Sequence, residues 1–263
     1  MFAARILILI PHPDDEVVGC CAAILRARSQ GARVFGLYLS DGLPAREELW
    51  PWARDARAAR EARRWREAAE ARDLLGLEEA GRQHLPSRRL RLHLTEAVAH
   101  VDRALETSGA DIMWVPAFEG AHQDHDAANA LAATFAARVP VWEFAEYNNA
   151  AGGHSQSQRF PDARGGGEQT LALTDDEVAV KRRALALYAS EHGNLRHIAA
   201  TREAFRPLPG HDYGRPPHPG TPFFARYRWV PFHPRVDRTD PAAVYRSLGA
   251  FARAHGVQIR ALP

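Results

Sequence analysis

The apolar run Ile6–Ile10, which leads directly into the sequence PHPDDE, is the feature that most restricts the fold of this chain. A short, continuous apolar run is typical of a strand that is buried on both faces of a sheet. The helix-forming sequence EVVGCCAAILRARSQG follows at once, and Gly31 is a natural end for that helix. A strand followed by a helix is the unit from which parallel sheets are built, so the sequence predicts an α/β fold.

The same alternation of strand and helix continues along the chain. We expect further strands at 32–40, 109–116 and 140–147, and helices at 45–75, 90–106 and 125–139. A last strand and helix cover 171–193, with Thr174 as the helix N-cap. The pattern predicts a Rossmann-like, mostly parallel sheet with helices on both faces and a site at the carboxyl ends of the strands.

Length and composition favour a single domain over residues 1–263. With 46% hydrophobic and 25% charged residues the chain is typical of globular proteins, and no clear linker or internal repeat divides it. The segment 148–169 is rich in Gly, Ser and Gln and has no periodicity, so we predict a mobile loop there. Residues 206–263 are rich in proline, histidine and aromatic residues, and we predict an irregular C-terminal extension.

Charge and hydrophobicity restrict the class of partner. The net charge of +2 argues against a dedicated nucleic-acid-binding protein, and the arginines of the basic segment 46–73 alternate with acids as in an exposed, salt-bridged helix. No stretch approaches the roughly 20 apolar residues of a membrane span. The N-terminus lacks a signal-peptide pattern, so we expect a cytoplasmic protein. A homo-oligomer is compatible with the sequence. The adjacent Cys20 and Cys21 are predicted to be buried free thiols.

Polar side chains follow the first strand, where burial of a charge is costly unless an opposite charge compensates it. Pro11 and Pro13 stiffen this segment, so that His12 and Asp14 can project to one side while Asp15 turns toward the helix entrance. Histidine nitrogen and carboxylate oxygen are ligands suited to zinc or a similar divalent ion. The segment therefore predicts a metal site.

A second polar group, in GAHQDHDAA, follows the strand expected at 109–116. His122 and His125 are three residues apart and can share one helical face, with Asp124 beside them. Taken alone, such a histidine pair is more often a capping or surface feature. Two acid–histidine groups at two strand ends can meet in one crevice. Together they provide three metal ligands, with acids and a histidine left over. This surplus is typical of an open catalytic metal site.

The sequence PHPDDEVVGC, followed later by GAHQDHDAAN, closely resembles the LmbE-like or PIG-L family of zinc-dependent N-acetylglucosaminide deacetylases. LSDG, RRWREAAEARDLLGL and LTDDEVAVKRRALALYASEHG also look like family segments, so the resemblance covers roughly residues 4–205. It implies one zinc ion per chain, bound by His12, Asp15 and His125. It further implies that Asp14 is the general base, that His122 stabilises the oxyanion and protonates the amine, and that Asp124 orients and tunes His122.

The resemblance implies the removal of the N-acetyl group from an N-acetylglucosamine-type sugar or glycoconjugate, with release of acetate. Candidate substrate contacts are Arg64, Asp41 of the LSDG segment, and Trp50, whose aromatic face suits a pyranose ring. A solvated helix face accounts for Arg64 equally well. Gln123 replaces a proline of many relatives at a position without a catalytic role, so we expect this change to be harmless. Gly120 stands where some disaccharide deacetylases carry a tyrosine.

Two alternatives remain at the level of the sequence. One is a related zinc amidase that acts on another N-acyl amide, such as a thiol conjugate or an antibiotic intermediate. The other is a non-enzymatic α/β module that binds nucleic acid or a partner protein through the arginine-rich helix. Metal content separates the second alternative from the enzyme.

Overall fold

The fold is built on a seven-stranded sheet of order β3-β2-β1-β4-β5-β9-β8. The computed structural model describes residues 1–152, 155–162, 166–195, 198–230, 233 and 236–257. The parallel strands are β1 (Arg5–Ile10), β2 (Arg33–Tyr38), β3 (Glu78–Arg82), β4 (Ile112–Pro116) and β5 (Val141–Phe144). Antiparallel strands β9 (Arg202–Pro207) and β8 (Gln169–Ala172) extend the sheet at the β5 edge. The predicted mostly parallel α/β sheet is confirmed.

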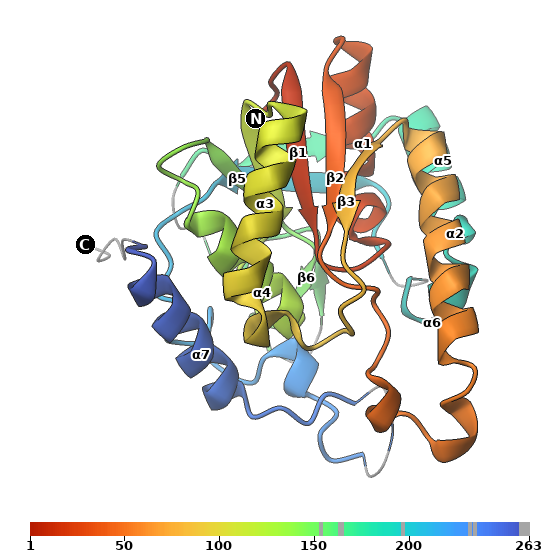
Figure 1. Cartoon of the computed structure of the whole chain (residues 1–263). Coiled ribbons are helices and arrows are strands. Elements are labelled where there is room, and N and C mark those ends of the chain that lie inside the picture. The colour runs from red at the N-terminus through yellow and green to blue at the C-terminus, as the bar shows by residue number, and fades with distance from the viewer. Residues whose placement is uncertain (153–154, 163–165, 196–197, 231–232, 234–235, 258–263) are drawn as a thin grey trace.

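Helices cover both faces of the sheet (Figure 1). The helices are α1 (Asp15–Ser29), α2 (Arg57–Leu75), α3 (Leu94–Ser108), α4 (Gln123–Ala133), α5 (Asp175–Leu187), α6 (His192–Leu195) and α7 (Pro241–Ala254). Strand β1 shows why two layers form: Leu7 and Leu9 pack with α3, α4 and α7, whereas Ile6, Ile8 and Ile10 pack with α1, α2 and α5. Side chains alternate between the two faces of a strand, so a run that is apolar throughout requires helices on both sides.

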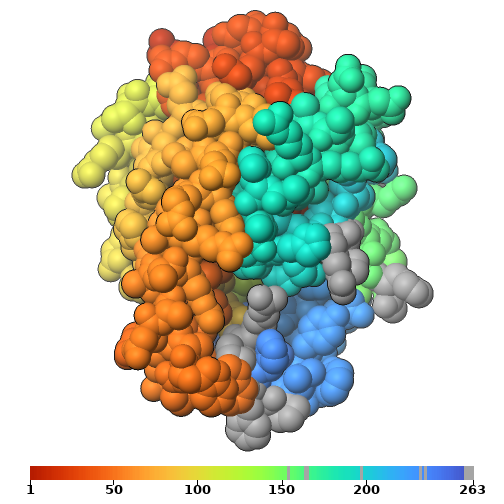
Figure 2. Space-filling view, turned by 90° about the vertical axis from the view of Figure 1, so that its right-hand side faces the viewer, coloured from red at the N-terminus to blue at the C-terminus, as the bar shows by residue number. Residues whose placement is uncertain are grey.

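The basic segment is a shorter helix than the sequence predicted. Helix α2 begins at Arg57, and residues 46–53 form two 3₁₀ turns instead of the expected helical start. Pro51 explains the break, because a proline keeps the preceding residue extended, and Trp50 has ψ 142°. The pairs Arg57–Glu61 and Arg63–Glu67 are separated by four residues, as expected for a salt-bridged helix. Helices α2 and α5 lie side by side on one face of the molecule (Figure 2).

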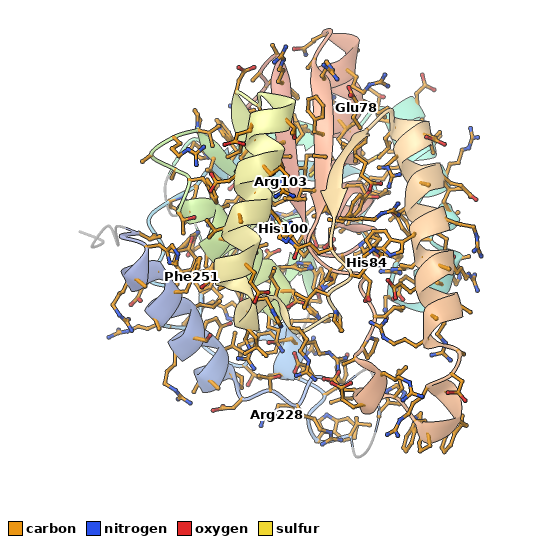
Figure 3. All side chains as sticks on the ribbon, viewed as in Figure 1. Glu78, His84, His100, Arg103, Arg228 and Phe251 are labelled. Atoms are coloured by element: carbon orange, nitrogen blue, oxygen red, sulfur yellow. The ribbon has the colours of Figure 1, made fainter. Side chains whose placement is uncertain are left out.

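Helix α3 shows the expected division between an apolar and a polar face. Its Ala97 and Val101 are fully buried, whereas His100 and Arg103 are exposed on its outer side (Figure 3). The helix ends at Gly109, whose φ of 58° is the left-handed conformation that glycine adopts without strain. Cys20 and Cys21 are buried free thiols, as predicted. None of the helices in the described ranges has the length and apolar character needed to cross a membrane.

The C-terminal segment is more regular than the sequence predicted. Residues 241–254 form helix α7, in which Val244, Tyr245 and Leu248 join the core on the α3–α4 side of the sheet. Asp240 caps the helix by accepting a hydrogen bond from the backbone N–H of Ala242. The prediction of an irregular extension is therefore wrong for this helix, which packs against the rest of the fold.

The segment predicted as a mobile loop contains some regular structure. Strands β6 (Tyr147–Asn148) and β7 (Gln156–Ser157) pair in a small hairpin. The side chain of Gln158 is buried and donates a hydrogen bond to the carbonyl of Val18 in α1. Residues 153–154 and 163–165 of this segment lie outside the described residues, and its mobility stays a prediction.

Candidate active site

The polar residues predicted from the sequence meet at the carboxyl ends of β1 and β4. These two strands are adjacent and parallel, so the segments that follow them leave the sheet side by side. After β1, the chain places His12 in the connecting turn and Asp15 at the start of α1. After β4, His122 is the N-cap of α4 and His125 lies in its first turn. Residues more than a hundred positions apart thus share one crevice.

Three buried donor atoms form a nearly equilateral triangle at this point. Nδ1 of His12 lies 3.3 Å from Oδ2 of Asp15 and 3.2 Å from Nε2 of His125, and the Asp15–His125 distance is 3.3 Å. A tetrahedral zinc ion with bonds of about 2.0–2.1 Å holds its ligand atoms roughly 3.3 Å apart. Two imidazole nitrogens and one carboxylate oxygen at this spacing fit a divalent metal ion. The predicted ligand set is therefore brought together by the fold.

Two further residues lie at the edge of this triangle. His122 groups with His12 and His125, and Glu146 groups with Asp15 and His125, each with its candidate ligand atoms within 4.8 Å of one another. The charges of His125 and His12 lower the pKa of Asp15 below its usual range, although burial acts in the opposite direction. The concentration of buried charge makes this crevice suited to a cation.

Each histidine of the triangle contacts a carboxylate outside the triangle. The contact is made by the ring nitrogen that points away from the triangle. Nε2 of His12 lies 3.1 Å from Oδ2 of Asp124, and Nδ1 of His125 lies 3.3 Å from Oε2 of Glu146. Histidines that bind metals generally donate their other N–H group to such a partner, which fixes the tautomer and the orientation of the ring. The His12–Asp124 contact is a hydrogen bond, whereas Nδ1 of His125 and the carboxylate of Glu146 lie close together without hydrogen-bond geometry.

Glu146 was missed by the sequence analysis. It is fully buried, and burial raises the pKa of its carboxyl group well above the ordinary value. The signal that could have found it is its place two residues beyond the end of β5, because the other site residues also follow parallel strands. A lone acid in the sequence FAEY carries no spacing pattern, so it did not stand out.

Asp124 contacts a different histidine from the one the sequence predicted. Its carboxylate binds His12 and accepts the backbone N–H of Arg88, whereas the shortest distance to the ring of His122 is 3.7 Å. Nδ1 of His122 accepts the backbone N–H of Asp124, so the proton of a neutral His122 resides on Nε2. Burial and the charge of His12 lower the pKa of His122 well below its ordinary value. Asp124 therefore lies closer to His12 than to His122, and its role in tuning His122 stays a prediction.

Asp14 is held in an unusual backbone conformation between the candidate ligands His12 and Asp15. Its φ is 128°, in the region that side-chain-bearing residues rarely adopt, and its backbone N–H donates to Glu16. Such strain is typical of functional sites that the surrounding structure holds in place. Burial raises the pKa of Asp14 to about 7, against the opposing charge of Arg64.

Arg64 is buried rather than part of a solvated helix face. Only 2% of its surface is exposed, and one nitrogen of its guanidinium donates to Oδ2 of Asp14 at 3.0 Å. The other terminal nitrogen lies 3.2 Å from Glu191, which follows α5. The surface interpretation of Arg64 is therefore wrong, and the side chain links the candidate base to α2.

The other two candidate substrate contacts differ in their surroundings. Asp41 is fully buried, and its oxygens accept the backbone N–H of Leu43 and pair with Arg57, so it stabilises the turn after β2 rather than facing a substrate. Trp50 is 38% exposed and stacks on Trp52 with ring planes 5° apart. Of the two candidate substrate contacts Asp41 and Trp50, only Trp50 is accessible.

Gln123 has a structural role that the sequence did not indicate. The side chain is fully buried, and its oxygen accepts the Nε–H of Arg91 at 3.0 Å. Its amide group donates to Asp237 at 2.6 Å and to Thr239 at 3.0 Å. A proline cannot make these bonds. Gln123 therefore connects the start of α4 to the segment that precedes α7. The expectation that glutamine in place of proline is harmless did not include this connection.

The comparisons with known proteins agree with this geometry. Residues 7–136 match the family model described as PIG-L: GlcNAc-PI de-N-acetylase. These residues form a PIG-L (LmbE-like) family domain. The matched range of the PIG-L domain contains both polar segments and all three corners of the triangle. It ends before β5, so Glu146 and the C-terminal helix lie beyond it. A search of curated proteins found no significant match to the chain.

Solved structures show that the fold is shared with deacetylases. The A40926 pseudoaglycone deacetylase Dbv21 is 19% identical with a TM-score of 0.62, over 78% of this chain and 96% of that one. A deacetylase of the teicoplanin biosynthesis pathway is 19% identical with a TM-score of 0.61, over 77% and 97%. The N,N'-diacetylchitobiose deacetylase from Pyrococcus horikoshii is 18% identical with a TM-score of 0.52, over 79% and 84%. At these identities the likeness shows the common fold of the PIG-L domain.

Proposed function

We propose that this protein is a zinc-dependent hydrolase that removes the N-acetyl group from an N-acetylglucosamine-type sugar or glycoconjugate and releases acetate. The observation that carries the proposal is the triangle of His12, Asp15 and His125, with Asp14 and His122 beside it. Membership of a deacetylase family supports the reaction type. The choice of an acetamido sugar rests on the family description and on the resemblance of the two motifs.

His12, Asp15 and His125 would hold the ion, and three protein ligands are the number typical of a catalytic zinc site. When bound, zinc supplies a Lewis acid that polarises the acetyl carbonyl and makes water more acidic. The acids Asp124 and Glu146 would orient the two histidine rings through the contacts described above. We therefore assign these acids as positioning residues.

Asp14 is the proposed general base. Its carboxylate is not one of the three corners of the triangle, so it is left to accept the proton of the attacking water. Arg64 fixes the orientation of the carboxylate by donating to one of its oxygens. Asp14 would then return the proton to the sugar nitrogen as the carbon–nitrogen bond breaks, so that acetate and the free amine leave. One carboxylate can serve both proton transfers.

His122 is the proposed donor to the carbonyl oxygen. With Nδ1 occupied by the backbone N–H of Asp124, its Nε2–H, whose nitrogen lies 3.5 Å from the hydroxyl oxygen of Ser87, can turn to donate as negative charge develops on the carbonyl oxygen. A neutral imidazole is sufficient for this role. We therefore retain the proposed oxyanion contact and transfer the protonation of the amine to Asp14.

An acetate-release assay with defined zinc loading tests the proposal. Metal is removed by a chelator, zinc is restored to one equivalent, and acetate is measured over N-acetylglucosamine, its oligomers and glycoconjugates. A solved teicoplanin deacetylase is described as a zinc-inhibited form, so the titration stays at or below one equivalent. Other N-acyl amides in the same screen test the alternative amidase. Acetate from none of the acetamido sugars, with a folded and zinc-loaded protein, would contradict the proposal.

A further inference from the structure

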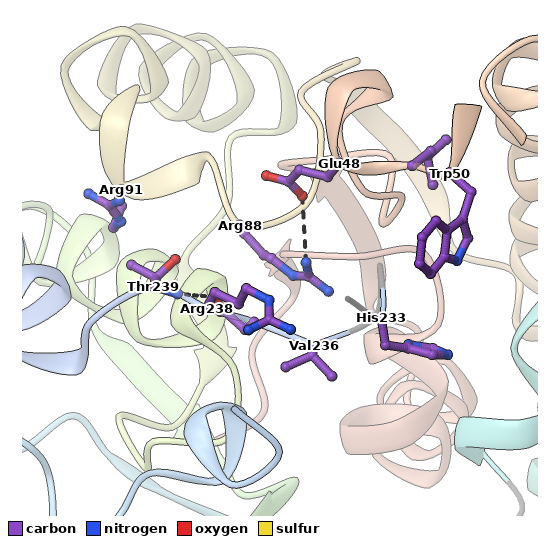
Figure 4. Close-up of a pocket in the computed structure, with 10 residues that line it drawn as sticks. Glu48, Trp50, Arg88, Arg91, His233, Val236, Arg238 and Thr239 are labelled. Carbon is purple, nitrogen blue, oxygen red and sulfur yellow. Dashed lines mark hydrogen bonds and ion pairs between the residues drawn. The ribbon is translucent and has the colours of Figure 1, made fainter. Parts of the chain in front are cut away.

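Two regions adjoin the residues of the candidate active site. One is a cavity of about 600 Å³, lined by residues 48–50, Arg88, Arg91, His233 and residues 236–239 (Figure 4). It touches the site at Arg88, whose backbone N–H donates to Asp124. The other region is a buried group of side chains around Asp14. The contacts that hold Asp14 in place belong to this second region.

The proposed base, Asp14, has to be held at two points, its backbone and its carboxylate. Its φ of 128° is a conformation that residues with a side chain keep only where the surrounding structure imposes it. Its carboxylate must also face the attacking water at hydrogen-bond distance in order to accept a proton. The residues that impose this conformation and this direction therefore affect the proton transfer without taking part in it.

Tyr188, at the end of α5, holds the backbone of Asp14 through Glu16. One oxygen of the Glu16 carboxylate accepts the backbone N–H of Asp14 at 3.1 Å, and the other oxygen accepts the hydroxyl of Tyr188. Glu16 and Tyr188 are both fully buried, so bulk water does not compete for these hydrogen bonds. Tyr188 thus orients the carboxylate that binds the backbone of Asp14.

Glu191, three residues further along, acts on the carboxylate of Asp14 through Arg64. One terminal nitrogen of Arg64 donates to Oδ2 of Asp14 at 3.0 Å, and the other lies 3.2 Å from Oε1 of Glu191 and 3.3 Å from Oγ of Ser190. The guanidinium also lies over the ring of Tyr188, with Cζ 5.7 Å from the ring centroid. Arg64 is therefore held between the proposed base and the segment 188–191.

The segment 188–191 is itself fixed to α2. The backbone N–H of Ser190 donates to the carboxylate of Glu67 at 3.0 Å, and the hydroxyl of Ser190 donates to the same carboxylate. Helices α2 and α5 pack side by side, so this segment follows directly from a helix–helix contact (Figure 2). One short and well-anchored segment thus reaches both the backbone and the carboxylate of Asp14.

We propose that Tyr188 and Glu191 are positioning residues for the proposed base. Tyr188 holds the backbone of Asp14 through Glu16, and Glu191 directs the carboxylate of Asp14 through Arg64. Neither residue binds the substrate or the metal. This inference rests on the proposed function for the role of Asp14, but the hold on its backbone can be measured without the reaction.

Two variants test the proposal through the reaction. Tyr188→Phe removes only a hydroxyl group, and Glu191→Ala removes the carboxylate that pairs with Arg64. Each should lower kcat for acetate release by roughly 10-fold, because a displaced base is less effective in the transition state. KM and the zinc content should stay the same, since neither residue contacts substrate or metal. Values of kcat that stay at the wild-type level in both variants would overturn the proposal and leave the deacetylase function standing.

Matched variants separate positioning from a general loss of stability. Tyr213→Phe also removes a buried hydroxyl, which donates to Asn129 at 2.7 Å, and it should leave kcat unchanged. Glu191→Gln keeps an oxygen that can accept from Arg64 and should recover most of the kcat that Glu191→Ala loses. An equal loss of kcat in Tyr213→Phe and Tyr188→Phe, or a glutamine variant no better than alanine, would contradict the assigned contacts. If Tyr188→Phe does not fold, the variants of the partly exposed Glu191 carry the test.

Hydrogen exchange keeps the positioning role separate from the reaction. In protein labelled with ¹⁵N-aspartate, the exchange rate of the Asp14 amide measured by NMR reports on its hydrogen bond to Glu16. We expect this amide to exchange roughly 10-fold faster in Tyr188→Phe and at the wild-type rate in Tyr213→Phe. That result supports the hold on Asp14 even if no acetate is released from any sugar. An Asp14 amide that exchanges equally fast in the wild type and in Tyr188→Phe would overturn the role of Tyr188.

Discussion

At the scale of single residues, the proposed function distinguishes the side chains that would bind the metal from the side chain that would move a proton. Asp14 and Asp15 are adjacent, yet only Asp15 lies at a corner of the triangle, while Asp14 bonds to Arg64. Asp14 also has an unusual φ of 128°. The fold thus gives two identical residue types different partners.

The variant Asp14→Asn should keep one zinc per chain and lose turnover by about 100-fold or more, because the proton acceptor is gone while the ligands remain. Zinc content by elemental analysis and acetate release are measured on the same sample. Asp15→Asn is the matched variant and should lose the metal. If Asp14→Asn loses the metal instead, the roles of the two acids are exchanged.

The variant Glu146→Ala should weaken zinc binding by roughly 10- to 100-fold, because His125 loses the acid that orients its ring. A competition titration against a chromophoric chelator measures the affinity, and a thermal melt of the metal-free protein checks the fold. Glu96→Ala, at an exposed position of α3, is the control. An unchanged zinc affinity in a folded Glu146→Ala protein would remove this role.

The sequence located the two polar segments because each follows a buried strand, where a change from apolar to polar residues is conspicuous. The choice of His12, Asp15 and His125 within these segments came from the family resemblance. The sequence did not locate Glu146 or the connections of Gln123, since these depend on contacts with segments far away in the chain. It also paired Asp124 with His122, its neighbour in sequence, whereas the fold pairs it with His12. Spacing within a motif indicates residue types better than it indicates partners.

At the scale of elements, a buried charge cluster joins β5 to β9 and to the segment that follows β9. Glu143 bonds to Arg206 at 2.6 Å and to His211 at 2.8 Å, and it is fully buried. Although burial alone would raise it, the charges of His211 and Arg206 lower the pKa of Glu143 to about 2. The carboxylate is therefore more stable as an anion in the folded protein than in the unfolded chain.

This depressed pKa predicts a loss of stability in acid. Because the folded value lies below the unfolded one, the contribution of Glu143 is complete above about pH 4.5 and is lost as the pH falls toward about 2. The size is on the order of 3 kcal/mol. Urea unfolding midpoints between pH 5 and pH 3 should fall more steeply for the wild type than for Glu143→Gln. Equal slopes of the urea midpoint against pH for the wild type and for Glu143→Gln would contradict this prediction.

Helix α7 should contribute to the stability of the fold, because it packs into the core. Leu248 is fully buried in the core, so Leu248→Ala should lower the free energy of unfolding by about 2–5 kcal/mol. Arg246→Ala, at an exposed position of the same helix, should change it by less than about 0.5 kcal/mol. Chemical denaturation of both variants makes the comparison. Equal, small effects would mean that the helix is not part of the core.

The elements that the sequence missed share a physical reason. Strand β3 lies at an edge of the sheet and reads EEAGR, which has no apolar run. Helix α7 carries a capping Asp240 and a proline at its first position, but the irregular sequence before it concealed these signals. Strand β9 lies between β5 and β8 and is largely buried, but it reads REAFRP and was also missed. The parallel strands β1, β2, β4 and β5 were predicted, because their burial imposes a continuous apolar pattern.

At the scale of the whole molecule, the candidate active site and the cavity beside it are built from segments near both ends of the chain. The two polar segments follow β1 and β4, and the residues before α7 return to line the cavity beside them. Gln123 couples the two regions through Arg91 and Asp237. The C-terminal segment lies outside the matched family range, residues 7–136.

The most direct test of the central claim is acetate release from an N-acetylglucosamine conjugate as the metal-free protein is titrated with zinc. The rate should be negligible without metal, rise in proportion to added zinc, and reach its maximum at one equivalent per chain, because His12, Asp15 and His125 would share one ion. The variant His125→Ala, which lacks one of the three candidate ligands, should show no such maximum at one equivalent. Full acetate release by the metal-free protein, or a rate that zinc does not raise, would contradict the account.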